Sequence, residues 1–203
     1  MRDAALAAVA ARLDAPSSCA AGMAIGQAMD QAAVTLARGT AFLRVQARQP
    51  WLDQPWCDRH RLVRSRVVGN WIGELDRLLH VLMDAAALRA GHAPTAWQRN
   101  TAAKLAALCT DAAWSAPQLA GMARARATFR YTQGAARRAD VRGGAYMTVG
   151  WSEPDGTLRR FRIGERVQLS GAALIEICDL YDELAARIVD TAAAFKERAH
   201  QGI

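Results

Sequence analysis

The sequence lacks paired cysteines. Cys19, Cys57, Cys109 and Cys178 lie far apart, and no two of them form a Cys-x-x-Cys motif. This spacing excludes a zinc knuckle and a dense disulfide framework, because both need cysteines in close pairs. Cys57 and His60 stand one helical turn apart, but no second pair at a matching spacing completes a metal site. We therefore expect buried free thiols, no metal and no other cofactor.

Long uncharged apolar segments are also absent. Charged residues interrupt every apolar run before it reaches the roughly 18 to 20 residues that a membrane-spanning helix needs. The N-terminus carries Arg2 and then acidic residues, and it lacks a basic region followed by an apolar stretch of the signal-peptide type. We expect a cytoplasmic protein with no membrane partner.

Most signatures of known catalytic sites are missing as well. The sequence contains no P-loop, no Gly-x-Gly-x-x-Gly after a strand, no Gly-x-Ser-x-Gly and no His-Glu-x-x-His. Gly143 and Gly144 lack the helix start that a phosphate-binding loop requires, so they indicate a bend before a hairpin. His80 lies beside an apolar stripe and is expected to be half-buried. These absences favour a protein that is not an enzyme, without deciding the question.

Helix-forming apolar residues are abundant. Of the 203 residues, 52% are hydrophobic and 22% are charged, so the chain can form a core of good size. Much of the apolar fraction is alanine, which has the highest intrinsic helix propensity. No internal repeat or linker divides the sequence, and we therefore expect a single domain, residues 1–203.

Apolar periodicity predicts a mostly α fold: a helical bundle of about five to six helices with one small β-hairpin inserted before the last helix. Three helices are expected in the N-terminal part, over residues 1–13, 17–49 and 58–89, and Gly39 suggests a break in the second of them. A fourth helix is expected to follow the Thr95/Gln98 capping box and to end at about residue 113. Ser115 and Gln118 are expected to open a fifth helix, and a closing helix is expected from Ser170. The hairpin is expected within residues 145–163, around the turn residues 154–156. Trp51 and Trp56 are expected to fix the turn after the second helix to the core. The apolar stripe of the closing helix is expected to face the core, with a partner-facing seam as the alternative.

Positive charge is in excess, and nearly all of it is arginine. The net charge is +7, and lysine occurs only as Lys104 and Lys196. Basic proteins attract nucleic acids and acidic surfaces. A GC-rich genome, whose codons favour alanine and arginine, would produce the same composition, so the charge alone does not identify a partner.

The basic residues concentrate in residues 121–144, GMARARATFRYTQGAARRADVRGG. Arg126 and Arg130 stand four residues apart and share a helix face, on which two guanidinium groups can grip successive phosphates. Phe129 or Tyr131 can stack on an unpaired base. The predicted site for an anion or RNA comprises Arg126, Arg130, Tyr131, Arg137, Arg138 and Arg142. The alternative is that Phe129 belongs to the core, the arginines are solvated, and Tyr131 caps the helix.

The layout of a long helical pair, an arginine in the segment RATFRY, a hairpin and a long closing helix resembles the HEPN superfamily of small α-helical proteins. The family's hallmark is an arginine, four to six intervening residues and a histidine, and members that keep it are often metal-independent ribonucleases that act as dimers. Arg126 matches the arginine, and Tyr131 stands where the shorter spacing would place the histidine. Tyrosine has an ordinary pKa near 10, so it cannot replace histidine in acid–base catalysis near neutral pH without a large shift. The resemblance covers the C-terminal half of the chain.

Three hypotheses follow. The first is a non-catalytic, HEPN-like module that binds RNA or a nucleotide, or that serves as a regulatory partner in a homodimer or with a small regulatory protein. The second is a residual metal-independent endoribonuclease that uses Arg126 with Tyr131 or a distant histidine. The third is a plain α-helical interaction protein whose charge has no functional meaning.

Overall fold

The computed structural model describes residues 18–92, 100–109 and 114–201. In this part of the chain six helices and one two-stranded sheet form, in the order α2 (Ser18–Gln46), α3 (Pro50–Asp53), α4 (Asp58–Arg89), α5 (Thr101–Leu108), α6 (Ala116–Thr132), β1 (Tyr146–Ser152), β2 (Leu158–Arg162) and α7 (Gly171–Gln201). The mostly α prediction with a hairpin before the last helix is confirmed. The helix expected over residues 1–13 and the Thr95/Gln98 capping box lie outside the described residues.

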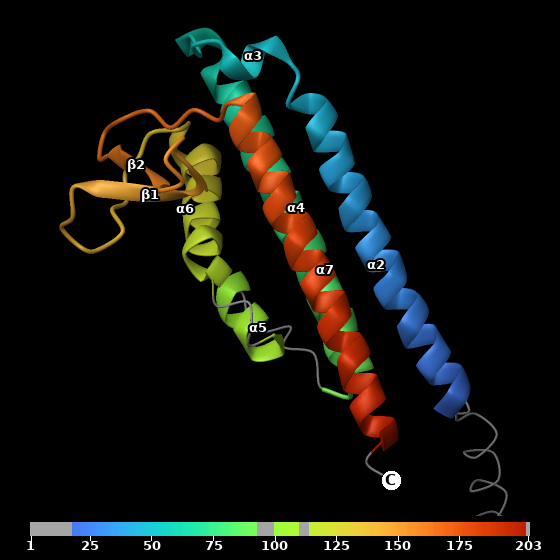
Figure 1. Ribbon diagram of the computed structural model, residues 1–203. Helices are drawn as coiled ribbons and strands as arrows, with labels where there is room; N and C mark the ends of the chain where they lie inside the picture. The colour runs from blue at the N-terminus through green and yellow to red at the C-terminus, as the bar shows by residue number, and fades with distance from the viewer. Residues whose placement is uncertain (1–17, 93–99, 110–113, 202–203) are drawn as a thin grey trace, which may run out of the picture.

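Three long helices, α2, α4 and α7, form the main body of the molecule (Figure 1). Each of the three contacts the other two, and α2 runs in the opposite direction to α4 and α7. In Figure 1, α2 lies on one side of the α4–α7 pair, and α6 lies on the other side with α5 near its first turn. None of the helices in the described ranges is long and apolar enough to cross a membrane.

The apolar stripes of α4 and α7 form the centre of the core. On α4 the side chains of Val68, Ile72, Leu75, Leu79 and Leu82 are buried, and the helix has the predicted bounds. The stripe of α7 is buried as well, through Leu174, Ile177, Tyr181, Leu184 and Ile188. This burial confirms the expectation that the stripe faces the core. An amphipathic helix is stabilised by burying its apolar face in this way.

The turn between α2 and α4 is fixed by tryptophans, as expected. Trp56 is buried, and its ring centroid lies 6.1 Å from that of Trp51 and 6.0 Å from that of Phe129. Trp51 also packs against Trp71 of α4 at 5.8 Å. This aromatic cluster joins the turn to both α4 and α6.

Two details of the helices differ from expectation. Helix α2 continues through Gly39 without a break, and a Cβ at this glycine would lie 3.2 Å from a δ carbon of Leu78. Gly39 therefore permits close packing of α2 on α4. Helix α6 begins after Ser115, as predicted, but the Ser115 side chain makes no capping hydrogen bond. Ser170 does act as a cap, since its hydroxyl accepts a hydrogen bond from the Ala173 amide at 3.1 Å.

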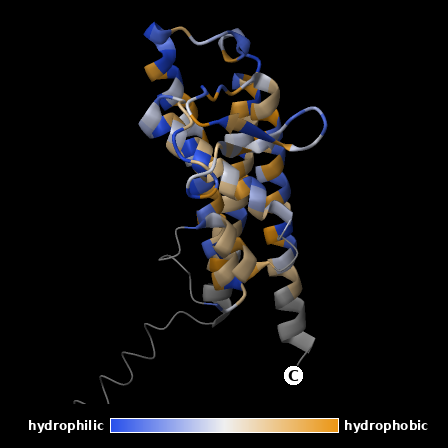
Figure 2. Cartoon of the chain, turned by 90° about the vertical axis from the view of Figure 1, so that its left-hand side faces the viewer, coloured by the Kyte–Doolittle hydropathy of each residue, from blue (hydrophilic) through white to orange (hydrophobic). Residues whose placement is uncertain are grey.

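The hairpin crosses α6 at a contact between two glycines. A Cβ at Gly121 of α6 would lie 2.5 Å from the Val149 carbonyl oxygen, and one at Gly150 of β1 would lie 2.5 Å from the Gln118 carbonyl oxygen. Neither position has room for a side chain. Figure 2 views the molecule from the side of α5, α6 and the hairpin, where the connecting loops are coloured mainly as hydrophilic. The contact fixes the loop of residues 133–145 beside α6.

Candidate anion-binding cleft

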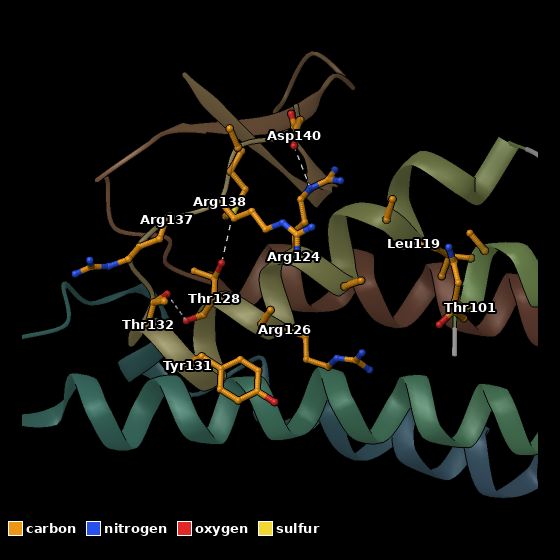
Figure 3. A pocket seen from close by; sticks show the side chains of 17 residues that line it. Thr101, Leu119, Arg124, Arg126, Thr128, Tyr131, Thr132, Arg137, Arg138 and Asp140 are labelled. Carbon is orange, nitrogen blue, oxygen red and sulfur yellow. Dashed lines mark hydrogen bonds and ion pairs between the residues drawn. The ribbon is translucent and has the colours of Figure 1, made fainter. Parts of the chain in front are cut away.

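A cleft of about 620 Å³ runs along α6 (Figure 3). Asn100, Thr101 and Ala102 of the α5 segment line one end, and residues 137–140 together with Met147 line one side. The α6 residues in the lining extend from Leu119 to Thr132. The cleft therefore follows most of the length of this helix.

The floor of the cleft is apolar and shallow. Ala120, Ala123 and Ala127 lie on one exposed face of α6, because their spacings of three and four residues match the helical repeat. Leu119 and Met147 add apolar surface beside them. Small side chains leave room for a flat group to lie against the helix.

Four of the six predicted site residues line the cleft: Arg126, Tyr131, Arg137 and Arg138. Arg130 and Arg142 do not. Tyr131 is 78% exposed, and it makes no hydrogen bond or ring contact with any residue of the described ranges. Its ring is thus open to a ligand. The residue that caps the C-terminus of α6 is Gln133, in the left-handed conformation (φ 53°), and not Tyr131. Phe129 is fully buried, as the structural alternative expected.

The face that Arg126 and Arg130 share lies against α4. A Cβ at Gly73 would lie 3.4 Å from Cδ of Arg126, and one at Gly69 would lie 2.8 Å from Cγ of Arg130. The aliphatic parts of both arginines therefore pack over glycines of α4. The Arg126 guanidinium forms an ion pair with Asp76. This pairing neutralises much of the charge that Arg126 could offer to a ligand.

A partly buried polar network lies beneath the end of the cleft that Thr101 lines, and it was not predicted from the sequence. Asp76 accepts a hydrogen bond from the Thr101 hydroxyl at 2.6 Å, and Nε2 of His80 lies 3.1 Å from the same hydroxyl. Lys104 of α5, whose side chain is only 4% exposed, pairs with Asp84 at 2.7 Å. The signal in the sequence is the spacing of Asp76, His80 and Asp84, each one turn after the last on α4. Together these bonds hold α5 against α4.

His80 supports the network and does not face the cleft. Burial lowers the pKa of His80, an effect that the charges of Asp76 and Asp84 oppose and those of Lys104 and Arg126 reinforce. Because the Thr101 hydroxyl donates its single hydrogen to Asp76, the neutral imidazole must donate from Nε2 to Thr101. Nε2, the ring nitrogen that faces Thr101, then has no lone pair with which to deprotonate it. The arrangement holds α5 in place and does not activate a nucleophile.

Arg124, which is not among the predicted site residues, also lines the cleft. Its Nε donates to the Thr148 carbonyl at 2.9 Å and lies 3.0 Å from the Asp140 carboxylate. Asp140 accepts further hydrogen bonds from the Thr148 amide and hydroxyl at 2.8 and 2.6 Å. Burial alone would raise the pKa of Asp140, but the Thr148 bonds and the charges of Arg124 and Arg160 lower it overall. Asp140 thus stays ionised and fixes the loop to β1.

Arg137 and Arg138 are exposed, and their side chains make no hydrogen bond or ion pair with any residue that the structure describes. In Figure 3 the Arg138 side chain extends toward Arg124, whereas that of Arg137 extends the opposite way. Both belong to the loop that Asp140 anchors. They supply the uncompensated positive charge of the cleft.

The structure offers no metal centre in the described ranges, where no group of three or more histidine, cysteine or acidic side chains could hold an ion. Cys57 Sγ lies 3.3 Å from Nδ1 of His60, but the pair is exposed and has no third ligand among these residues. Cys109 and Cys178 are buried free thiols, as expected, whereas Cys57 is exposed.

Comparison with known proteins gives no match: no family model fits the chain, and no curated protein or solved structure is similar to it. The HEPN resemblance therefore stays an expectation based on the sequence layout and the Arg126/Tyr131 spacing. The cleft has to be interpreted from its own chemistry.

Proposed function

We propose that this chain is a non-catalytic helical module that binds a phosphorylated ligand, RNA or a nucleotide, in the α6 cleft. The observation that carries the proposal is that two arginines of the cleft, Arg137 and Arg138, have no acidic partner among the described residues and share the cleft with an exposed tyrosine, Tyr131. Guanidinium groups bind phosphate oxygens through two parallel hydrogen bonds, and aromatic rings stack on unpaired bases.

The dimensions of the cleft support a ligand of nucleotide size. Its volume of about 620 Å³ falls within the roughly 300 to 1,000 Å³ that is usual for small-molecule sites. The alanine face of α6 gives a base an apolar surface, and the loop arginines give a phosphate its counter-charge. The polar atoms of Thr128 and Thr132 are already used: the Thr128 hydroxyl contacts Met147 Sδ, and the Thr132 hydroxyl donates to carbonyl oxygens.

Binding is favoured over ribonuclease activity because the described residues that line the cleft include no suitable proton-transfer group. Among them Asp140 is the acid, and its carboxylate is held ionised by Arg124 and Thr148. His80, the histidine that could have acted at a distance, lies behind Thr101 and is not part of the lining. General acid–base catalysis needs a group within hydrogen-bond reach of the substrate.

A double variant tests this proposal. Arg137→Ala/Arg138→Ala should weaken binding of a short fluorescent RNA by about 1 to 3 kcal/mol, because two phosphate contacts are lost. Fluorescence anisotropy at two salt concentrations measures this loss and the accompanying decrease in salt dependence.

Arg38→Ala/Arg48→Ala is the matched control. Both residues are exposed in the α2 region, neither side chain has a partner among the described residues, and the change in net charge is the same. The control should bind RNA nearly as the wild type does. Equal losses in the two double variants would contradict a local site and indicate a nonspecific effect of net charge.

A further inference from the structure

A second, much smaller recess lies at the C-terminal end of α6. Its volume is about 40 Å³, and it is lined by Trp56, Arg61, Gln133, Arg166, Val167 and Gln168. Three segments that are distant in sequence meet here: the turn before α4 together with the first turn of α4, the end of α6, and the connection from β2 to α7. The predicted anion site did not include any of these six residues.

Hydrogen bonds between the segments hold the recess in shape. The Gln168 amide nitrogen donates to the carbonyl oxygens of Leu52 and Gln54 at 3.1 and 2.8 Å. Nη2 of Arg61 donates to the Trp56 carbonyl at 2.9 Å, and Nη1 pairs with the exposed carboxylate of Asp58. The guanidinium of Arg61 is thereby fixed at the wall of the recess.

Two donors at the recess remain available to a ligand. Arg166 and Gln133 are exposed, and their side chains make no hydrogen bond or ion pair within the described ranges. Among the described residues, the one acid that pairs with a side chain lining the recess is Asp58, which pairs with Arg61 and whose side chain is 88% exposed. Two guanidinium groups therefore face one solvent-screened carboxylate, which leaves the recess electropositive.

The recess and the cleft have lining residues that are neighbours in the chain. Thr132 lines the cleft and Gln133 lines the recess, and Cα atoms of consecutive residues are about 3.8 Å apart. The exposed ring of Tyr131 precedes them in the chain. The C-terminal end of α6 thus contributes Tyr131 and Thr132 to the cleft and the next residue, Gln133, to the recess.

We propose that the recess among Arg61, Gln133 and Arg166 is a phosphate subsite for the same strand that occupies the cleft, so that the ligand is a single-stranded oligonucleotide and not a free mononucleotide. This inference rests on the proposed function. A recess of about 40 Å³ is far smaller than the cleft of about 620 Å³. It suits a phosphate group better than a base.

The test compares Arg166→Ala with Arg162→Ala, using two probes, an eight-nucleotide uridine RNA and uridine monophosphate. Arg162 is an exposed arginine of β2 whose side chain has no partner among the described residues, so its loss changes the net charge equally. The Arg166→Ala variant should bind the octamer roughly three- to tenfold more weakly than the Arg162→Ala variant does. The slope of log affinity against log salt should fall by about 0.7, which is the value for one phosphate on a single strand. Monophosphate binding, measured by calorimetry, should be the same in both variants.

The outcomes separate the two proposals. If Arg137→Ala/Arg138→Ala weakens octamer binding while Arg166→Ala matches its control, the cleft stands and the second subsite is refuted. An equal loss of octamer and monophosphate binding in Arg166→Ala also overturns the subsite, because it would place Arg166 at the nucleotide itself. If none of these variants alters the affinity for the octamer, both proposals fail. Arg166→Glu, which adds repulsion, should weaken octamer binding further than Arg166→Ala, and an unchanged affinity would contradict the subsite.

Discussion

At the scale of single residues, Asp76 explains most about how the site is built. Its carboxylate pairs with Arg126 of α6 and accepts the hydroxyl hydrogen of Thr101, so one side chain of α4 joins α5 and α6. A partly buried carboxylate needs such partners, since an unpaired buried charge is costly. The loop arginines, by contrast, have no such partners in the described part of the chain. This difference separates the arginines that build the cleft from those available to a ligand.

His80 makes the stability of the folded protein depend on pH in a defined direction. Burial lowers its pKa below the ordinary value near 6.5, with Asp76 and Asp84 opposing and Lys104 and Arg126 reinforcing the shift. The unfolded chain therefore binds a proton more readily than the folded one as the pH falls through 6.5, and the free energy of unfolding should decrease. Because carboxylates also titrate, the measurement is the difference between wild type and His80→Gln in urea unfolding at pH 7.5 and 5.5. Wild type should lose more stability between these pH values than the variant, and an equal or smaller loss would contradict this role.

At the scale of secondary-structure elements, the contact between α6 and β1 positions the cleft. Gly121→Ala should destabilise the protein by about 1 to 3 kcal/mol or more, because the new methyl group would overlap the backbone of β1. Gly26→Ala on α2 is the matched control, since its Cβ would lie 3.7 Å from Arg89 Nη1, an ordinary contact. Removal of a helical glycine with room for a methyl group should be neutral or stabilise by roughly 0.5 to 1 kcal/mol. Thermal unfolding measures both, and similar effects from the two changes would contradict the close packing of α6 on β1.

The elements also show what sequence patterns can and cannot predict. The bounds of α4 followed from its apolar stripe, and the hairpin followed from turn residues around Gly156, because both signals are local. The network of Asp76, His80 and Thr101 was missed, because acids within a helix usually face solvent and the partner lies on another helix. Arg126 and Arg130 were correctly placed on one face of the helix. That this face packs against α4 depends on Gly69 and Gly73 of α4, which leave room for the two arginine side chains. Partners that are distant in sequence determine which charges are compensated.

At the scale of the whole molecule, the net charge of +7 is unevenly compensated. Asp179 and Asp182 of α7 pair with Arg44 of α2, and these bonds raise the pKa of Arg44 further. Arg126 of α6 pairs instead with Asp76 of α4. Two further arginines of the long helices, Arg77 and Arg187, pair with Glu74 and Glu183. Arg137 and Arg138, in the loop after α6, and Arg166, in the connection after β2, have no acidic partner among the described residues.

The most direct measurement of the central claim is the salt dependence of RNA binding by the wild-type chain. Affinity for the uridine octamer should be measured by anisotropy from about 50 to 200 mM salt. If Arg137, Arg138 and Arg166 each contact a phosphate, log affinity should fall with log salt at a slope of about −2, since each contact to a single strand contributes about −0.7. No detectable binding at the lowest salt, or an affinity that does not change with salt, would contradict a phosphate-binding cleft.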